Sequence, residues 1–324
     1  MSDRPVVLSL RALGLGDLLT AIPALRGVAD AFPEHRKVLA APRSLAALAV
    51  MSGAVDEIID TRELGAISID GPVDVAVNVH GRGPESHRSL CALQPRRLIA
   101  FEHPDVDAST GSPRWRRDEH EVARWCRLLS EVGIDADPRR LDLPHPAPPV
   151  RFDVTDATVV HPGAASAARR WPAARWAAVA RAEVAAGHRV LATGTARERP
   201  LATAIADAAR LDPSSVLAGR TSVTDLAAIV ANAGIVLSGD TGIAHLAVAF
   251  ATPSVTLFGP TDPAHWGPSV DRQEHRVVWN GTTGDPHGDH VDPGLLRIGV
   301  LDVLDAVHDL RAARRPAEIL EAAS

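Results

Sequence analysis

Short apolar runs rich in β-branched residues alternate with longer amphipathic stretches along the whole chain. Runs of the first kind fit buried strands, and apolar residues spaced three or four positions apart mark one face of a helix. Leu18, Ile22, Leu25 and Val28 form such a face. This alternation is typical of parallel sheets covered by crossover helices, so we expect an α/β fold.

The expected elements fall into two sets. In the first half, we expect strands at Val6–Leu10, Lys37–Ala41, Glu57–Asp60, Val73–Val79 and Arg97–Ala100, with helices at Asp17–Ala31 and Glu119–Val132. In the second half, we expect strands at Thr158–His161, Arg189–Ala192, Ser215–Leu217, Ile235–Ser238 and Ser254–Phe258. Helices are expected there over 175–186, 197–209, 223–233, 242–250 and 300–323.

A proline-rich segment separates the two sets. Asp135–Phe152 contains five prolines, which exclude a regular helix and indicate an interdomain linker. A length of 324 residues also exceeds what one hydrophobic core usually organises. We therefore expect domains at residues 1–148 and 149–324, and the last helix is a candidate to pack back across the first domain.

Composition and charge narrow the class of protein. Apolar residues make up 46% and charged residues 23% of the chain, which excludes a largely disordered, fibrous or membrane-embedded protein. A formal charge of −6 does not attract nucleic acid or an anionic bilayer, so any anion site must be local. Cys91 and Cys126 cannot build a disulfide framework, and the apolar run Val6–Leu10 is too short for a signal peptide. We expect a cytoplasmic protein whose membrane contact is at most peripheral.

Three loops carry the candidate chemistry, and each follows an expected strand, where open α/β sheets bind ligands. In the first loop, Leu13–Asp17, the glycines Gly14 and Gly16 let backbone amides approach a ligand, and Asp17 lies at a helix start. Helix capping by Asp17 is an equally good interpretation of its position. The dinucleotide fingerprint is not matched, because Leu19 stands where its third glycine would be.

The second loop, His161–Pro172, combines small residues with the adjacent cations Arg169 and Arg170. Guanidinium groups give forked hydrogen bonds to phosphate oxygens, so this loop suits a phosphate. Solvated surface charges are the alternative interpretation, and His161 is more often structural.

The third loop, Ser238–His245, leads from an expected strand into a helix. The first amides of a helix lack partners, so a diphosphate fits at Thr241 and Gly242. Helix capping by Asp240 is the alternative and is compatible with ligand binding.

Two further segments are weaker candidates. Asp285–Asp292 offers carboxylates and imidazoles at spacings that a divalent ion could use, but its glycines and prolines favour a solvated loop. The arginines and histidines between His80 and Arg117 fit either a phosphorylated acceptor or a solvated surface. We therefore expect no metal site.

Together the motifs resemble glycosyltransferase family nine, the ADP-heptose:lipopolysaccharide heptosyltransferases and their relatives. The resemblance rests on GLGDLLTAIPALR at 14–26, HPGAASAARRWP at 161–172, LAGRTSVTDLAAIVANAG at 217–234 and SGDTGIAHLAVAFATPSVTLFGPTDPAHWGP at 238–268. It implies a GT-B architecture, in which two Rossmann-like domains face each other across a central cleft. The first domain would then bind the acceptor and the second the sugar nucleotide.

The resemblance also implies roles for single residues. Asp17 corresponds to the general base of an inverting transferase, and Arg169 to the residue, usually lysine, that binds the nucleotide phosphates. Thr241 and Gly242 match the diphosphate-binding turn. The further donor-site candidates are His161, Ser166, Glu198, Asp240 and His245, of which Glu198 would reach the nucleotide ribose.

The expected reaction moves a sugar, foremost heptose from ADP-heptose, to a hydroxyl group of a glycan or small molecule, and requires no metal or other cofactor. Many relatives carry cysteines near 281–296, where this chain has GTTGDPHGDHVDPGLL. Two rival functions stay open. One is a sugar-nucleotide epimerase or hydrolase on the same fold, and the other is a non-catalytic protein that binds nucleotide sugars.

Overall fold

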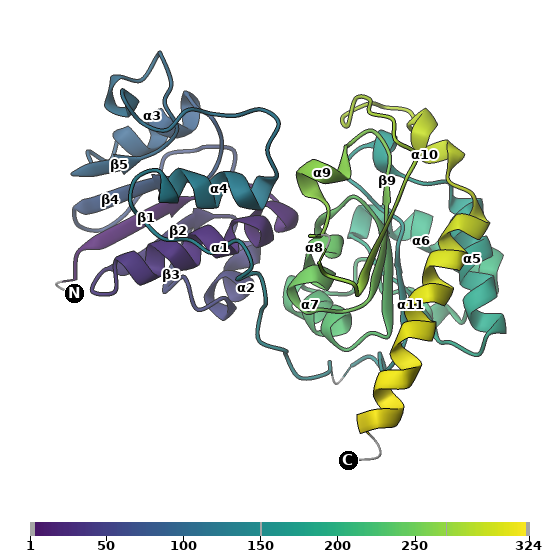
Figure 1. Ribbon diagram of the computed structural model, residues 1–324. Coiled ribbons are helices and arrows are strands. Elements are labelled where there is room, and N and C mark those ends of the chain that lie inside the picture. The colour runs from purple at the N-terminus through teal and green to yellow at the C-terminus, as the bar shows by residue number, and fades with distance from the viewer. Residues whose placement is uncertain (1–3, 150, 270, 322–324) are drawn as a thin grey trace. The chain divides into compact units, whose positions relative to one another are not determined.

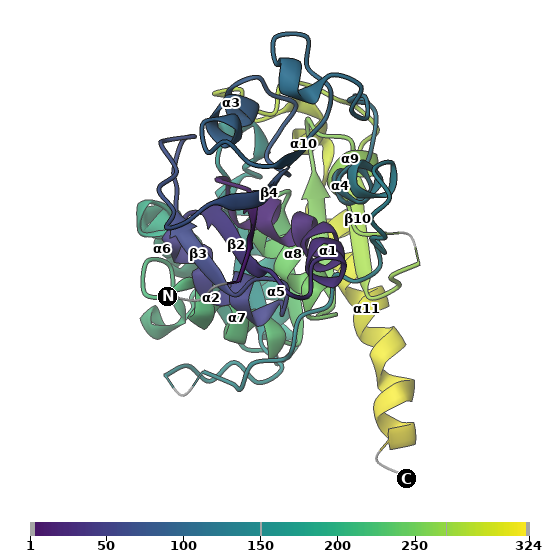
Figure 2. The same ribbon diagram turned by 90° about the vertical axis from the view of Figure 1, so that its left-hand side faces the viewer.

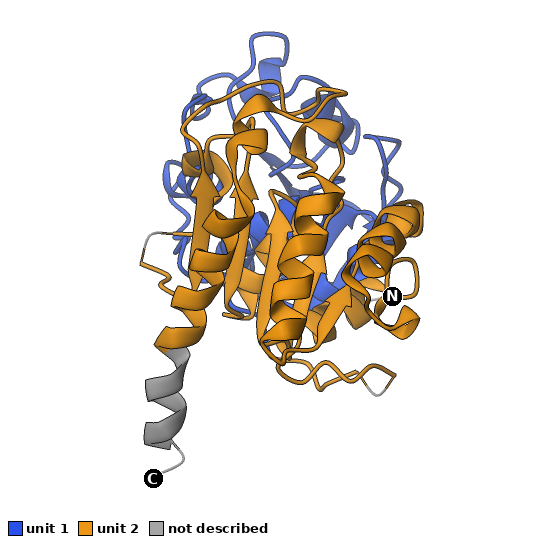
Figure 3. Cartoon of the chain, turned by 90° about the vertical axis from the view of Figure 1, so that its right-hand side faces the viewer, with its two compact units in different colours: residues 1–144 blue, residues 145–324 orange. Residues whose placement is uncertain are grey.

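The computed structural model describes residues 4–149, 151–269 and 271–321, with 314–321 as backbone alone. The chain folds into two compact units that divide between Pro144 and His145, inside the proline-rich segment (Figure 3). Each unit contains a parallel five-stranded sheet packed with helices (Figure 1, Figure 2). The α/β fold class predicted from the sequence is confirmed.

Unit 1 has the strand order β3-β2-β1-β4-β5. Its strands are β1 (Val6–Leu10), β2 (Arg36–Ala41), β3 (Glu57–Asp60), β4 (Val73–Asn78) and β5 (Arg97–Ile99). Its helices are α1 (Leu15–Ala31), α2 (Ala46–Met51), α3 (Glu85–Cys91) and α4 (Glu121–Ser130). The central strand β1 is buried along its whole length, as in a sheet covered by helices on both faces, and Leu8, Leu10 and Val38 lie in the core.

Unit 2 has the strand order β10-β9-β8-β6-β7. Its strands are β6 (Thr158–His161), β7 (Val190–Ala192), β8 (Ile235–Gly239), β9 (Ser254–Phe258) and β10 (His275–Trp279). Its helices are α5 (Ala173–Ala185), α6 (Arg199–Ala209), α7 (Val223–Ala231), α8 (Gly242–Ala249), α9 (Pro263–Trp266), α10 (Pro293–Arg297) and α11 (Val300–Glu321).

Both sheets reverse their strand order beside their first strand. In unit 1, β1 lies between β2 and β4, and in unit 2, β6 lies between β7 and β8. Connections leave opposite faces of an open sheet at such a point, which opens a crevice at the carboxyl ends of the strands. The topology therefore gives each unit one favoured ligand position.

The prediction of a strand at Ser215–Leu217 is wrong. Pro213–Ser215 forms a 3₁₀ turn, and Asp212 caps it by accepting the Ser214 amide at 2.8 Å. Only Val216 bridges to Ala192 of β7. The capped turn uses the residues that would have begun the strand.

The sequence pattern does not predict strand β10, because its first two residues, His275 and Arg276, are polar and only three apolar residues follow them. The pairing with β9 nevertheless extends over the whole strand, from His275 beside Ser254 to Trp279 beside Phe258. Pairing with a buried neighbour therefore outweighs the weak local pattern.

Helix α11 packs on α5, β9 and β10 of its own unit. Its buried face consists of Val303, Val307 and Leu310. Residues 322 and 323 of the expected helix lie outside the described residues. Packing across the first domain concerns the relation between the two units and stays a prediction.

Replacing Arg311 with methionine should lower the free energy of unfolding by about 3 kcal/mol, because it leaves a buried carboxylate without its cation. Arg311 Nη2 donates to Glu183 Oε2 at 2.7 Å and to Thr158 Oγ1 at 2.8 Å, joining α11 to α5 and β6. Urea unfolding measures the loss, with Arg297→Met at an exposed position as the control. An effect no larger than that of the control would show that this pair does not hold α11.

Candidate functional site

Asp17 lies in the first turn of α1, at the carboxyl edge of the unit 1 sheet. Its Oδ2 accepts a hydrogen bond of 3.1 Å from the Gly14 amide, so the carboxylate closes the start of the helix. The side chain still keeps 29% of its surface exposed. Asp17 therefore caps the helix and also presents a carboxylate to solvent, so the two interpretations of its position are compatible.

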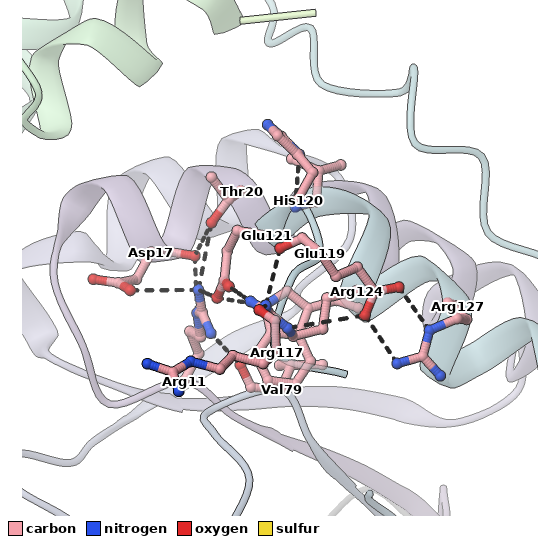
Figure 4. A network of polar contacts seen from close by, with 12 residues as sticks. Arg11, Asp17, Thr20, Val79, Arg117, Glu119, His120, Glu121, Arg124 and Arg127 are labelled. Atoms are coloured by element: carbon pink, nitrogen blue, oxygen red, sulfur yellow. Dashed lines mark hydrogen bonds and ion pairs between the residues drawn. The ribbon is translucent and has the colours of Figure 1, made fainter. Parts of the chain in front are cut away.

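The buried guanidinium of Arg11, directly after β1, lies beside Asp17 (Figure 4). Arg11 Nε donates to the Asp17 carbonyl at 2.9 Å, and Nη1 donates to the Val79 carbonyl at 2.5 Å. Arg11 Nη2 lies 2.9 Å from Glu121 Oε1 and 3.4 Å from both Asp17 Oδ1 and Thr20 Oγ1. One cation thus joins the ends of β1 and β4 to the starts of α1 and α4.

Glu121, in the first turn of α4, supplies the negative charge that pairs with the Arg11 guanidinium. Its Oε1 also accepts a hydrogen bond of 2.9 Å from Trp125 Nε1, and its Oε2 pairs with Arg124. The guanidinium carbon of Arg11 lies 5.0 Å from the centre of the Trp125 ring, a cation–π contact. Burial by itself raises the pKa of Glu121, but Arg11 and Arg124 outweigh it and hold the pKa below its ordinary value. Glu121 is therefore a carboxylate.

His80 follows β4 at the same edge of the sheet. Its amide donates to Asn78 Oδ1 at 3.0 Å, and its Nδ1 is buried with no hydrogen-bond partner among the described residues. Burial and the charge of Arg11 lower the pKa of His80 to about 4, against the opposing effect of Asp17. His80 is thus a neutral imidazole near the candidate base, and its buried ring does not fit the solvated surface that was one of the two interpretations of this segment.

His87, in α3, is a second buried histidine of this segment. It is buried, with Nε2 lying 2.7 Å from the Phe101 carbonyl and Nδ1 lying 3.0 Å from Asn78 Nδ2. A carbonyl can only accept, so Nε2 carries the proton and Nδ1 accepts from Asn78. Burial lowers the pKa of His87, which fits a neutral, structural imidazole.

In unit 2, His161 ends β6 and points toward β7. Its Nδ1 lies 3.0 Å from Thr193 Oγ1, and burial lowers the pKa of the imidazole while Glu198 acts in the opposite direction. Glu198 Oε2 accepts hydrogen bonds from the Thr195 amide at 2.8 Å and from its hydroxyl at 2.9 Å. The other oxygen of Glu198, Oε1, lies close against the second loop. A Cβ on Gly163 would be 2.0 Å from it. A side chain at position 163 would therefore force the Glu198 carboxylate to turn away from the loop.

Arg169 closes the 3₁₀ turn Ala167–Arg169 in the second loop. Its Nη1 lies 3.3 Å from the Asp240 carbonyl and 3.7 Å from Asp240 Oδ2. Asp240 therefore pairs with Arg169 and does not cap α8, whose N-cap residue is Thr241, so the alternative interpretation of Asp240 as a helix cap is wrong. Within the described part of the chain, Arg169 Nε and Ser238 Oγ are buried without partners.

The third loop leads into α8 as the sequence pattern predicts. The Thr241 side chain makes no capping hydrogen bond, and the helix begins at Gly242. The first helical amides have no intrahelical acceptor, so this turn can donate to an anion. His245 lies one turn further along and contacts Trp266 edge to face, with ring centres 6.0 Å apart, which ties α8 to α9.

The loop that contains Asp285–Asp292 packs directly on the second loop. Ser166 Oγ donates to the Pro286 carbonyl at 2.6 Å, so its proton is used inside the protein. The Ala168 amide donates to the Gly288 carbonyl at 3.1 Å, and the Ala168 carbonyl accepts from the Asp292 amide at 3.2 Å. Within 4–149, 151–269 and 271–313, where side chains are described, no three His, Cys, Asp or Glu residues gather to hold a metal ion. These contacts make the loop a support for the turn that carries Arg169.

Solved structures with this architecture identify the fold. A family 9 glycosyltransferase from Veillonella parvula matches with a TM-score of 0.76 at 18% identity, over 94% of this chain and 97% of that chain. The E. coli ADP-heptose LPS heptosyltransferase II matches with a TM-score of 0.74 at 18% identity, over 95% and 99%. E. coli heptosyltransferase WaaC with ADP matches with a TM-score of 0.70 at 18% identity, over 94% and 99%. The fold is that of a GT-B glycosyltransferase.

Sequence comparison gives the family. Residues 112–288, more than half of the chain, match the model of glycosyltransferase family 9 (heptosyltransferase). The chain belongs to this family, and it is a glycosyltransferase of the heptosyltransferase type. No curated protein matches the chain.

Two observations bear on cofactors and membranes. The iron-containing dodecameric glycosyltransferase TibC from enterotoxigenic E. coli matches with a TM-score of 0.60 at 15% identity, over 97% of this chain and 77% of that chain. The expectation that no cofactor is required therefore stays a prediction.

Among the described helices, none combines the length and apolar character needed to cross a bilayer.

Gly163→Ala should destabilise the protein by roughly 1–3 kcal/mol, because the new methyl group meets the carboxylate of Glu198. Adding Glu198→Ala should remove most of this effect, since the clashing group is then absent. Urea unfolding of both single variants and of the double variant measures the coupling between the two positions. Simple additivity would show that Glu198 does not lie across the loop.

Proposed function

We propose that this protein is an inverting glycosyltransferase that moves heptose from ADP-heptose to a hydroxyl group of a glycan or small molecule. The observation that carries the proposal is the carboxylate of Asp17, which is open to solvent and held by the Gly14 amide and the Arg11 guanidinium. Unit 2 supplies an anion site, where Arg169 and the Thr241–Gly242 turn share one sheet edge. A structure of TibC in complex with ADP-D-β-D-heptose and one of WaaC with ADP support the choice of donor.

In the proposed reaction, the proton of the acceptor hydroxyl passes to the Asp17 carboxylate. The acceptor oxygen attacks the anomeric carbon from the side opposite the diphosphate. The new C–O bond forms as the bond to the diphosphate breaks, and the electron pair of that bond leaves with ADP. The products are ADP and a glycoside of inverted configuration, and the proton then passes from Asp17 to solvent.

The leaving diphosphate gains negative charge, which fixed donors can stabilise without reorganising. The contact between Arg169 Nη1 and Asp240 Oδ2 is long, at 3.7 Å, so the guanidinium keeps donors for phosphate oxygens. The amides of the Thr241–Gly242 turn add the positive end of α8. This scheme contains no step that passes through a metal ion.

The remaining candidates have supporting roles in the proposal. Both hydrogen bonds from Thr195 go to Glu198 Oε2, so Oε1 is placed to accept a hydrogen bond from a ribose hydroxyl. His161 and His245 hold the loops through their contacts with Thr193 and Trp266. Ser166 anchors the second loop, and its oxygen can still accept a hydrogen bond.

A binding screen followed by product analysis tests the function as a whole. ADP, ADP-heptose, UDP-glucose and GDP-mannose are compared by thermal shift, because a ligand that binds only the folded state raises its melting temperature. ADP-heptose is then incubated with and without a panel of glycan and small-molecule alcohols, and the products are identified by mass spectrometry. ADP release that depends on an acceptor supports transfer. Release without an acceptor favours a hydrolase, isomerised ADP-heptose favours an epimerase, and binding without conversion favours a non-catalytic protein.

Asp17→Asn should reduce turnover by about 10²–10⁴-fold, because the amide cannot take the acceptor proton. It should leave the affinity for ADP within about twofold, since the amide oxygen can still accept the Gly14 amide. Steady-state kinetics and calorimetric titration with ADP measure the two effects. Asp30→Asn, at an exposed carboxylate of the same helix, is the matched control. Normal turnover in Asp17→Asn would remove this residue from the role of base.

Arg169→Ala should instead weaken ADP binding by about 10- to 100-fold, because charged hydrogen bonds to the diphosphate are lost. Arg181→Ala provides the control, since Arg181 is an exposed residue of the same unit whose guanidinium bonds to the Ala208 carbonyl on the helical surface. Titration with ADP measures both variants. Equal affinities for ADP in the two variants would exclude Arg169 from the phosphate site.

A further inference from the structure

Arg11 Nη2 is shared between two carboxylates. This nitrogen carries two hydrogens and faces three acceptors, with Glu121 Oε1 at 2.9 Å and both Asp17 Oδ1 and Thr20 Oγ1 at 3.4 Å. The hydrogen bond to Glu121 is therefore the strong one, and the contact with Asp17 is the weak one. Arg11 Nε and Nη1 bind the carbonyls of Asp17 and Val79, which leaves the guanidinium little freedom to turn.

Glu121 is held in place at least as firmly as Arg11. Its side chain is 7% exposed, and it bonds to Trp125 Nε1 at 2.9 Å and to Arg124. The Asp17 side chain, by contrast, is 29% exposed. The buried pair of Arg11 and Glu121 is thus a fixed support, and the Asp17 carboxylate is the partner that faces solvent.

A general base next to a cation meets two opposing requirements. The cation orients the carboxylate, but its full charge would favour the ionised form so strongly that proton uptake would become harder. A second carboxylate on the same cation reduces this effect, because it neutralises most of the charge at close range. Arg11 Nη2 lies 2.9 Å from Glu121 Oε1 and 3.4 Å from Asp17 Oδ1, so the nearer carboxylate is the one that neutralises the cation.

We propose that Arg11 is a positioning residue for Asp17, and that Glu121 sets how much of the Arg11 charge acts on the base. This inference rests on the proposed function, in which Asp17 accepts the acceptor proton. A structural support with no effect on the reaction is the competing explanation, and the two differ in what they predict for the pH dependence of turnover.

The charged and titratable groups that face Asp17 within unit 1 come from three elements. Arg11 follows β1, His80 follows β4 and Glu121 begins α4. Turnover should fall at acid pH as the base becomes protonated, and we call this fall the acid limb of the pH profile. His80, with a pKa of about 4, also titrates at acid pH, so its contribution has to be measured separately.

The test measures kcat and kcat/KM against pH with ADP-heptose and the alcohol that supports ADP release in the panel, or water where release needs none. Glu121→Gln should move the acid limb to lower pH by roughly one unit, because the full charge of Arg11 then acts on Asp17. Arg11→Gln should move it to higher pH by a similar amount and reduce kcat by about 10- to 100-fold, because the cation and its orienting bonds are lost. The double variant Arg11→Gln/Glu121→Gln removes the buried pair as a unit. It should also lie on the high-pH side of Glu121→Gln.

Two control variants isolate the effect. Arg127→Gln breaks another largely buried pair on α4, with Arg127 Nε 2.6 Å from Glu119 Oε1, and should lower stability without moving the acid limb. His80→Gln shows whether the limb belongs to the imidazole. All variants are titrated with ADP, whose affinity should stay within about twofold because the anion site lies in unit 2.

Opposite shifts of the acid limb in Glu121→Gln and Arg11→Gln support the proposal, and the double variant decides if Arg11→Gln does not fold. An unchanged limb, or shifts in the same direction, would overturn it in favour of a purely structural pair. Loss of the limb in His80→Gln would also overturn it, since the limb would then report His80. Undiminished turnover in Asp17→Asn would reject the proposed function itself, a result distinct from the failure of this inference alone.

Discussion

The parallel direction of the strands is the constraint on which the rest of this structure depends. Because every crossover returns the chain to the end of the sheet where its strands begin, all strands end together at the opposite, carboxyl edge, and residues far apart in sequence meet there. Asp17, His80 and Glu121 reach one edge of unit 1 in this way, and Arg169 and Thr241 reach one edge of unit 2. The reversal of strand order beside β1 and β6 then selects the place along each edge where a ligand fits.

Arg11 and Arg169 differ in how many of their hydrogen-bond donors have partners, and this difference distinguishes a structural arginine from one that can bind a ligand. A buried guanidinium needs acceptors for its donors, and Arg11 finds them in two carbonyls and two carboxylates. Arg169 has one long ion pair with Asp240, and its Nε has no partner in the described part of the chain. The satisfied cation organises unit 1 around the candidate base. The unsatisfied one retains donors for an anion, which is what a phosphate site requires.

The corrections arise where tertiary contacts compete with local pattern. Val216 has the apolar neighbours of a strand, yet the capped turn at Pro213 leaves it a single bridge to β7. Asp240 stands near a helix start, where a cap is common, but Thr241 takes the N-cap position and the Asp240 carboxylate lies near the cation of Arg169 instead. The fold buries the imidazoles of His80 and His87, which the sequence left between a solvated surface and an acceptor site, and burial favours the neutral imidazole.

The sequence by itself determined the α/β class, most element positions and the three loops that carry Asp17, Arg169 and Thr241, because periodicity, glycines and strand ends are local properties. It did not indicate Arg11 or Glu121, which lie 110 residues apart and meet only when β1 and α4 pack together. It also gave no sign that the proton of Ser166 is bound by Pro286 or that Glu198 lies across Gly163. Such contacts join distant segments, so only the tertiary structure could decide which candidates support the site and which face a ligand.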